Sequence, residues 1–209
     1  MTDPGVSGIV LAGGAARRFG GDKLAAPFGG RPLLDRAVDA LAALASEVIV
    51  VVAPGDDRRL PTAPVPVSRA IDPERHGGPL VGLLAGLEVA REPIAVVVGG
   101  DMPTLAPDVL ALLARSLRAH EGSADAAVLV QRGALRPLPA AVRNGAATHA
   151  ARRLIGEGER SLRRLFDDLH VHGLDEMEWR SLDPEGTTLR DVDRPEDLPR
   201  DGSGETSRT

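Results

Sequence analysis

At 209 residues the chain is long enough for one sizeable hydrophobic core and too short for two full-sized domains. Its net charge of −5 excludes a broad basic surface for nucleic acids, and three phenylalanines and one tryptophan are too few aromatic side chains for a base-stacking platform. Because the sequence contains no cysteine, disulfides, thiolate metal sites and thiol catalysis are excluded as well.

The first residues, "MTDPGVSGIVLAGG", contain neither a basic region nor a long apolar stretch, so we expect no signal peptide. No apolar run approaches the roughly 18 residues that indicate a membrane span. The sequence therefore predicts a cytoplasmic protein that binds neither membranes nor nucleic acid.

Strand-like apolar runs and helical patterns alternate along the chain. In chain order we expect a strand at 7–14, a helix at 32–44, a strand at 47–54, a loop with three prolines at 55–70, a helix at 78–91 and a strand at 93–101. The series continues with a helix at 106–120, strands at 124–131 and 138–143, one or two helices within 149–169, and a short strand followed by a helix start within 188–198.

This alternation predicts right-handed βαβ crossovers and a mostly parallel sheet covered by helices on both faces. The expected fold class is α/β, a single-domain Rossmann-like three-layer sandwich over residues 1–198, with residues 199–209 as a disordered tail. Ligands of such sheets bind beyond the carboxyl ends of the strands. The glycine-rich loop after the first strand and the "GGDMP" after the third should therefore face one crevice.

The stretch "LAGGAARRFGGDKL" places glycines and positive charge directly after the first strand. Backbone N–H groups of glycines, together with the side chains of Arg17, Arg18 and Lys23, suit the binding of a polyphosphate. The spacing fits neither the P-loop pattern nor the dinucleotide pattern G-x-G-x-x-G. The alternative is a tight turn whose basic side chains only face solvent.

Asp101 ends the third strand and precedes Met102 and Pro103, so its carboxylate is held on a rigid strand end. A carboxylate in that place can bind Mg²⁺ while phosphates and water fill the other coordination positions. The alternative is an aspartate that caps the next turn or helix. A polyphosphate loop at the same edge of the sheet favours the metal role.

Several motifs together resemble those of the sugar- and cofactor-nucleotidyltransferases. "LAGGAARRFGGDKL" is similar to their signature L-A-(A/G)-G-x-x-x-R-(M/F)-G-x-x-K, "HGGPLVGLLAGL" to their G-P-L-x-G-(L/I) segment and "GGDMPTLAP" to their D-x-P motif. "RPLPAAVR", "GERSLRRLF" and "DVDRPEDL" resemble later landmarks of the molybdenum cofactor guanylyltransferase branch, the MobA-like proteins. The likeness covers about residues 6–198 and implies the nucleotide-diphospho-sugar transferase type of the α/β sandwich.

The resemblance assigns roles to the residues that follow the first strand. The backbone of Leu11, Ala12 and Gly13 would hold the base and ribose of the nucleotide. Gly14 and Arg18 would lie along the phosphates, with Arg18 as the arginine of the motif.

The resemblance also implies Mg²⁺ as the cofactor. Lys23 matches the lysine of the motif and would bridge phosphate oxygens, and Asp101 matches the metal ligand, so that these two residues and Arg18 are the expected catalytic residues. Asp193 is the expected second metal ligand, with Asp191 as the alternative. Either aspartate could instead cap the helix expected at "RPEDL".

Asp72, six residues before Gly78, resembles the acidic residue with which the family reads guanine, and Gly78 and Pro79 would line the base pocket. Guanine presents its N1–H and N2–H₂ donors side by side, and one carboxylate can accept both. Cytosine offers a donor beside an acceptor, which a carboxylate matches less well. GTP is therefore favoured over CTP.

The implied reaction transfers GMP from GTP to the terminal phosphate of molybdopterin and releases pyrophosphate. The attacking phosphate is already anionic, so catalysis would depend on positioning and charge neutralisation. Arg132, Arg136 and Arg143, which lie near the later strands, are candidates for holding the acceptor phosphate. Molybdoenzymes or their chaperones are candidate protein partners.

Other functions fit the same motifs. The enzyme could transfer CMP to molybdopterin, or a nucleotide to a sugar or polyol phosphate. Outside catalysis, the fold could serve a nucleotide-binding regulator, although a mere binder need not retain both Lys23 and Asp101. Pyrophosphate release from each nucleoside triphosphate separates these alternatives.

Overall fold

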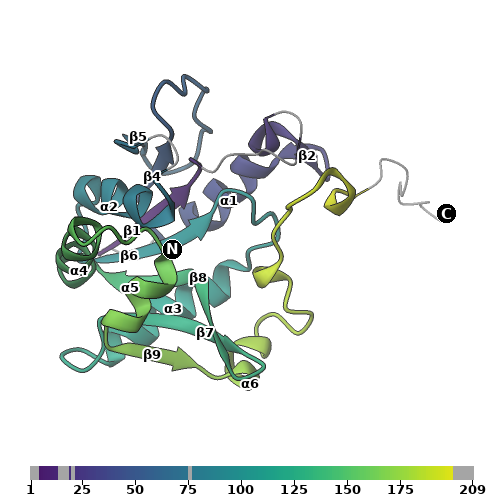
Figure 1. The fold of residues 1–209 in the computed structure, drawn as a ribbon. Coiled ribbons are helices and arrows are strands. Elements are labelled where there is room, and N and C mark those ends of the chain that lie inside the picture. The colour runs from purple at the N-terminus through teal and green to yellow at the C-terminus, as the bar shows by residue number, and fades with distance from the viewer. Residues whose placement is uncertain (1–4, 14–18, 20–21, 75–76, 200–209) are drawn as a thin grey trace.

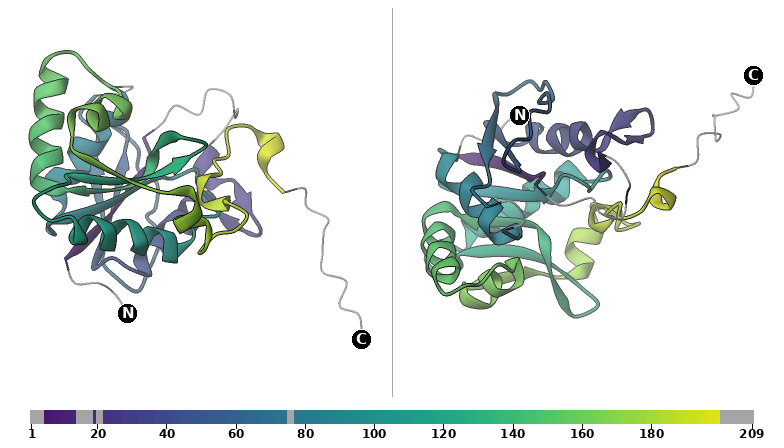
Figure 2. Two further views of the ribbon diagram at one scale, coloured as in Figure 1. Left: turned by 90° about the horizontal axis from the view of Figure 1, so that it is seen from below. Right: turned by 45° about the horizontal axis from the view of Figure 1, so that its top comes forward.

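The structure is a computed structural model that describes residues 5–13, 19, 22–74 and 77–199. A seven-stranded sheet forms the middle layer, and helices cover both of its faces (Figures 1 and 2). This arrangement confirms the predicted α/β three-layer sandwich. Within the described part of the chain, no helix is long and apolar enough to cross a membrane. Most of the expected tail, residues 200–209, lies outside the described residues.

The strand order of the sheet is β5-β4-β1-β6-β8-β7-β9, in which β8 runs antiparallel to both of its neighbours and the other pairs are parallel. The strands are β1 (Val6–Leu11), β4 (Glu47–Val52), β5 (Val67–Ile71), β6 (Ile94–Gly99), β7 (Ala126–Gln131), β8 (Ala134–Arg143) and β9 (Val171–Leu174). The central strands β4 and β6 are buried along their whole length, which explains why they read as unbroken β-branched runs.

Two apolar cores lie on opposite faces of this sheet. One is covered by α1 (Leu33–Ala42), α3 (Pro107–Ala119) and α6 (Glu176–Arg180), the other by α2 (Pro79–Val89), α4 (Asn144–Gly156) and α5 (Leu162–Asp168). In the first core, Trp179 of α6 is fully buried and donates its indole N–H to the Val130 carbonyl at 2.9 Å. Both layers can be followed in Figure 2.

Helix α2 packs unusually close to the sheet. A Cβ atom on Gly86 would lie 2.8 Å from Ile9 Cγ2 and 3.0 Å from Val51 Cγ2, so only glycine fits between this helix and strands β1 and β4. The close approach holds the first turn of α2 beside the carboxyl ends of those strands.

The structure corrects the sequence-based prediction at three places. The segment expected to be loop throughout 55–70 contains the start of edge strand β5, which has only one neighbouring strand and so needs no continuous apolar run. The strand and helix expected within 188–198 are instead the short 3₁₀ turns η2 (Thr187–Leu189) and η3 (Pro195–Asp197). Strand β9 and helix α6, which are both short, were not predicted at all.

The C-terminal segment crosses back to the beginning of the chain. Val192 is buried together with Phe28 and Leu33, beside the small hairpin of β2 (Pro27–Phe28) and β3 (Arg31–Pro32). The guanidinium of Arg190 lies 5.3 Å from the centre of the Phe28 ring. In Figure 1 this yellow segment accordingly runs beside the purple region around β2.

Candidate active site

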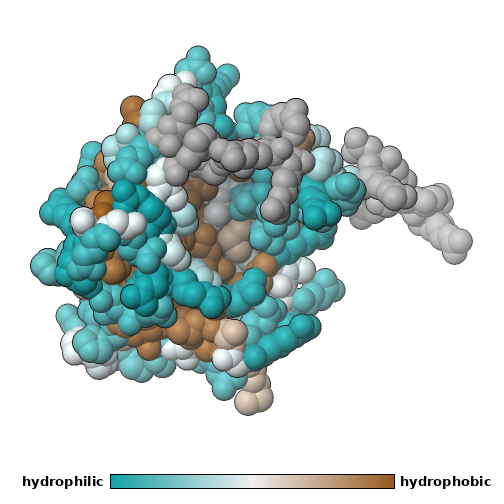
Figure 3. Space-filling model, in the orientation of Figure 1, coloured by the Kyte–Doolittle hydropathy of each residue, from teal (hydrophilic) through white to brown (hydrophobic). Residues whose placement is uncertain are grey.

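A cavity of about 410 Å³ opens at the carboxyl ends of β1, β4 and β6, where ligands bind in sheets of this kind. Its lining residues are Leu11, Gly13, Val51, Asp72, Gly78, Pro79, Gly82, Gly99, Asp101 and Leu138. The face drawn in Figure 3 is hollowed near its middle, and apolar residues lie in the hollow with hydrophilic surface around them. Most of the residues predicted to bind a nucleotide thus meet around one cavity.

The register of the sheet explains why these residues meet. The cavity wall also contains residues that the sequence did not predict, among them Gly82. Leu11 pairs with Val51 on one side and with Gly99 on the other, so β1, β4 and β6 end at the same level. Gly82 follows Gly78 by one helical turn and therefore faces the same side of α2. The spacing of these two glycines was the signal that could have identified Gly82.

Of the two residues after β1, Ala12 is hydrogen-bonded to β4, and Gly13, which has no side chain, lines the cavity. Ala12 is buried and donates its N–H to the Val51 carbonyl at 2.8 Å. A Cβ on Gly13 would lie 3.6 Å from the Ala53 nitrogen and 3.9 Å from Asp72 Oδ2. A ligand at this wall meets the Gly13 backbone within reach of the Asp72 carboxylate.

Asp72 is a nearly buried carboxylate, with 7% of its surface exposed. Its Oδ1 accepts the Glu74 N–H at 2.9 Å, whereas no residue of the described chain donates to Oδ2. Burial raises the pKa of Asp72; the Glu74 N–H counteracts this shift and the Glu74 carboxylate adds to it. A ligand that presents N–H donors to Oδ2 would supply a partner that no described residue provides.

Gly78 begins helix α2 in a conformation that requires glycine. Its φ is +88°, and a Cβ there would lie 2.9 Å from the carbonyl oxygen of Arg160. That carbonyl accepts the N–H of Leu80, and the Arg160 guanidinium pairs with Glu74 at 3.3 Å. The loop between α4 and α5 therefore supports both Gly78 and the segment that follows Asp72.

Lys23 lies between two carboxylates. Its Nζ is 2.8 Å from Asp101 Oδ2 and 3.4 Å from Asp193 Oδ1, and only 13% of its side chain is exposed. The structure thus brings together three of the predicted catalytic and metal-binding residues. The other predicted phosphate contacts, Gly14 and Arg18, lie outside the described residues.

Two backbone features place the carboxylates beside Lys23. The N–H of Val192 donates to the Asp101 carbonyl at 3.0 Å, which anchors the C-terminal segment at the end of β6. The turn before η3 is held by Asp197, whose carboxylate accepts the N–H groups of Asp193 and Arg194. Asp193 is therefore not the cap of this turn, and its own side chain is left to face Lys23.

The donor set fits a magnesium ion that is bound partly by its substrate. Asp101 and Asp193 offer hard carboxylate oxygens, and among the described residues no cluster of three or more His, Cys, Asp or Glu side chains could hold a metal by itself. Mg²⁺ commonly takes one or two protein carboxylates and completes its shell with phosphates and water. Asp191, the alternative ligand, lines a neighbouring cavity together with Asp101.

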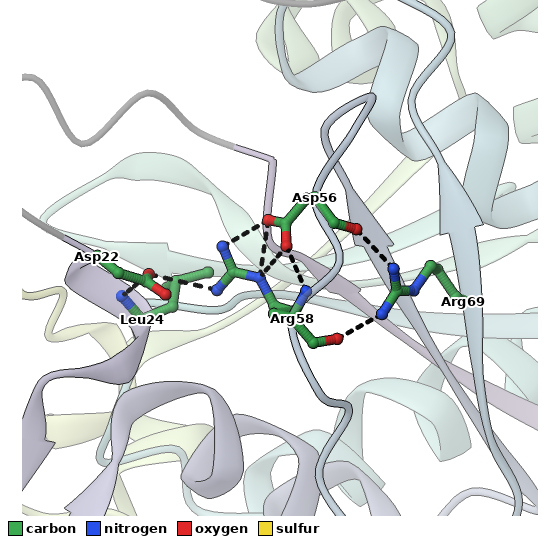
Figure 4. A network of polar contacts seen from close by, with 5 residues as sticks. All are labelled: Asp22, Leu24, Asp56, Arg58 and Arg69. Atoms are coloured by element: carbon green, nitrogen blue, oxygen red, sulfur yellow. Dashed lines mark hydrogen bonds and ion pairs between the residues drawn. The ribbon is translucent and has the colours of Figure 1, made fainter.

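A polar network missed by sequence reasoning holds the turn that carries Lys23 (Figure 4). Asp22 caps η1 (Lys23–Ala25) by accepting the Leu24 N–H at 3.1 Å, and Arg58 reaches Asp22 at 3.4 Å. Arg58 also binds Asp56, and despite the opposing effect of burial these contacts lower the pKa of Asp56. Arg69 of β5 donates to the carbonyls of Asp56 and Arg58.

A second cavity, of about 300 Å³, adjoins the first, because Asp101 and Leu138 line both. Arg136 also lines it, so one of the arginines proposed for the acceptor phosphate lies near Asp101. The predicted role of Arg143 in binding the acceptor phosphate was wrong. Arg143 pairs with Ile94 at the amino-terminal end of β6, away from both cavities, and its side chain donates to the carbonyls of Leu117 and Ala124. Arg132, at the β7–β8 turn, lines neither cavity.

A mostly parallel sheet with a cavity at its strand ends, lined by glycine backbone and carboxylates, defines a nucleotide-binding α/β protein. The chain matches the MobA-like NTP transferase domain over residues 8–173 and belongs to this family of nucleotidyltransferases. The resemblance of its motifs is thereby confirmed.

Individual relatives agree with this assignment. The chain is 35% identical over 197 residues to the probable molybdenum cofactor guanylyltransferase of Chloroflexus aggregans, an alignment that covers 92% of this chain and 91% of that protein. It is 34% identical to the molybdenum cofactor guanylyltransferase of Mesorhizobium japonicum, with 92% of each chain covered. The structure of molybdopterin-guanine dinucleotide biosynthesis protein A from Archaeoglobus fulgidus matches with a TM-score of 0.72 at 22% identity, over 92% of this chain and 94% of that one.

The raised pKa of Asp72 predicts a pH-dependent cost in stability. Because the folded pKa lies above its ordinary value of 3.8, the ionised carboxylate opposes folding above the folded pKa, and this cost disappears once the pH falls below 3.8. Asp72→Asn should therefore unfold at higher urea concentration than the wild type at neutral pH, and the difference should vanish in acid. Exposed Asp57→Asn is the control, and a difference that does not change with pH would contradict the prediction.

Proposed function

We propose that this protein transfers GMP from GTP to the terminal phosphate of molybdopterin and releases pyrophosphate. The observation that carries the proposal is a single cavity lined both by the buried Asp72 carboxylate and by Asp101, the ion-pair partner of Lys23. The named guanylyltransferases that align with almost the whole chain support this choice of donor and acceptor.

In this proposal Asp72 selects the base. Its Oδ2 accepts no hydrogen bond from a described residue and lies beside the Gly13 backbone and the first turn of α2, so it can accept the N1–H and N2–H₂ donors of guanine. The small residues around it, Gly78 and Gly82, leave space for a purine ring. Losing either hydrogen bond leaves a nearly buried charge without its partner, which makes the site discriminate strongly against other bases.

The transfer needs positioning and charge neutralisation. An oxygen of the acceptor phosphate attacks the α-phosphorus of GTP, and the bond from that phosphorus to the pyrophosphate oxygen breaks. The attacking oxygen is already anionic, so no side chain has to remove a proton. Lys23 offsets the negative charge that grows on pyrophosphate. Mg²⁺ held by Asp101 and Asp193 would supply further charge neutralisation to the phosphates.

The adjoining cavity is the proposed acceptor site. It shares Asp101 with the nucleotide cavity, so a phosphate placed there lies next to the catalytic carboxylate. Arg136 is exposed, and its side chain forms no hydrogen bond or ion pair with any described residue. Its guanidinium is therefore available to a phosphate, and Leu162 and Leu189 give the same cavity an apolar wall for a flat heterocycle.

The proposed activity is tested by incubating the protein with Mg²⁺, molybdopterin and each nucleoside triphosphate in turn. GTP should support pyrophosphate release and formation of the dinucleotide, and CTP and ATP should be at least about tenfold poorer. Faster release with CTP would identify a cytidylyltransferase. Release only with a sugar or polyol phosphate would change the acceptor, and no release with any acceptor would leave a nucleotide-binding regulator.

The role of Asp72 is tested by comparing GTP with ITP, which lacks only the 2-amino group. The wild type should bind GTP about 10- to 150-fold more tightly, the range expected for a hydrogen bond to a charged group. Asp72→Ala should remove most of this difference when both nucleotides are titrated by calorimetry. A variant that weakens both nucleotides alike but keeps the difference would exclude Asp72 from base recognition.

The role of Arg136 is tested by steady-state kinetics with molybdopterin as the varied substrate. Arg136→Ala should raise the KM for molybdopterin by about tenfold or more while leaving the affinity for GTP unchanged. Arg132→Ala is the matched control, because this arginine lies outside the cavity and should have little effect. Equal effects of the two substitutions, or a loss of GTP affinity, would count against the acceptor site.

A further inference from the structure

Lys23 is the only lysine of the sequence, and the other 24 of its 25 basic residues are arginines. The one position that keeps lysine is the one between Asp101 and Asp193. Arginine holds carboxylates through a rigid planar fork, whereas the lysine ammonium is a point charge on a flexible four-carbon stem. The Lys23 ammonium can therefore exchange one partner for another more readily than a guanidinium held in a bidentate pair could.

Lys23 occupies the carboxylate oxygen of Asp101 that is best placed to bind a metal. A Cβ on Gly99 would lie only 2.6 Å from Asp101 Oδ1, so this oxygen packs over the Gly99 backbone and Oδ2 is the one that faces Lys23. The Asp101 oxygen that remains for a metal is thus the one that the Lys23 ammonium holds at 2.8 Å. A divalent ion placed beside an undisplaced ammonium would also be strongly repelled.

The carboxylate pair does not attract a metal strongly while Lys23 is present. The ammonium cancels one of the two negative charges, and the nearby carboxylate of Asp22 is engaged by Arg58 and by the Leu24 N–H. The described residues contain no third acidic or histidine side chain that would complete a metal site with this pair. A triphosphate changes this balance, because its oxygens offer Lys23 new partners and supply the missing metal ligands.

We propose that Lys23 is an internal counter-ion of the Asp101–Asp193 pair, and that a divalent metal loads only together with the nucleotide that draws Lys23 away. The inference rests on the proposed function in one respect, since the nucleotide that moves Lys23 is the GTP of the transfer reaction. It adds an order of binding: the free protein is closed to the metal, and the nucleotide opens the site.

The single lysine allows a direct test on the wild type. Protein labelled with lysine that carries ¹³C at Cε only should give one side-chain cross-peak in a carbon–proton NMR spectrum, that of Lys23. The peak should shift on addition of α,β-methylene GTP, which cannot be cleaved at the α-phosphorus. Paramagnetic Mn²⁺ should broaden the peak when the analogue is present and leave it sharp when Mn²⁺ is added alone at the same concentration. Equal broadening by Mn²⁺ alone would overturn the proposal.

The affinity of variants for Mn²⁺ gives a second test of the proposed role of Lys23. Without nucleotide, Lys23→Met should bind Mn²⁺ at least about tenfold more tightly than the wild type, because a full positive charge leaves the carboxylate pair. Adding Asp101→Asn to this variant should abolish the gain. Arg91→Met removes a positive charge from an exposed residue paired with Glu47 at the start of β4 and should leave Mn²⁺ affinity unchanged. Equal affinity of Lys23→Met and the wild type would refute the inference.

Neither measurement uses transfer activity, so failure of the proposed function can be recognised separately. If the transfer assay selects CTP, the NMR experiment is repeated with the matching cytidine analogue. A protein that transferred GMP normally but bound Mn²⁺ equally well with and without nucleotide would retain the proposed function and lose the proposed order of binding.

Discussion

The candidate site depends on one constraint: the parallel strands β1, β4 and β6 end in register with one another. Because Leu11 is hydrogen-bonded in register with both Val51 and Gly99, the chain leaves β1, β4 and β6 at the same height. Gly13, the segment towards Asp72 and the turn that carries Asp101 then surround one space. Helix α2 completes the wall only because Gly86 lets it approach the sheet. A displacement of one strand would separate the Asp72 carboxylate from the Asp101 carboxylate, which now line the same cavity.

The cluster of Lys23, Asp101 and Asp193 joins an early segment of the described chain to a late one. The Val192 N–H bonds to the Asp101 carbonyl, and the packing of Val192 against Phe28 holds the C-terminal segment over the region that follows the glycine loop. Arg58 and Arg69 tie the same region to β5 from the other side. The turn that begins at Lys23 is thus held by the Asp22 cap and by the Arg58–Asp22 contact, while the Lys23 side chain pairs with Asp101 and Asp193.

The sequence predicted the parts of the fold that local patterns encode. Buried strands such as β4 carry continuous apolar runs and amphipathic helices such as α3 carry apolar periodicity, and the resemblance to the family's motifs identified Lys23 and Asp101. Edge strands β5 and β9 were missed because one neighbour suffices to order them. The role of Arg143 was misjudged, since only the antiparallel direction of β8 puts its last residue at the far edge of the sheet. Long-range contacts such as Arg58 with Asp22 leave no local pattern.

The position of Trp179 determines which part of the protein its intrinsic fluorescence reports. It is the only tryptophan in a chain without tyrosine, so the intrinsic ultraviolet fluorescence of the protein comes almost entirely from this one indole. The ring is buried under β7, which β6 and β8 separate from the strand that leads into the glycine loop. Its emission therefore reports the integrity of the distal half of the sheet and stays largely silent when the nucleotide cavity fills.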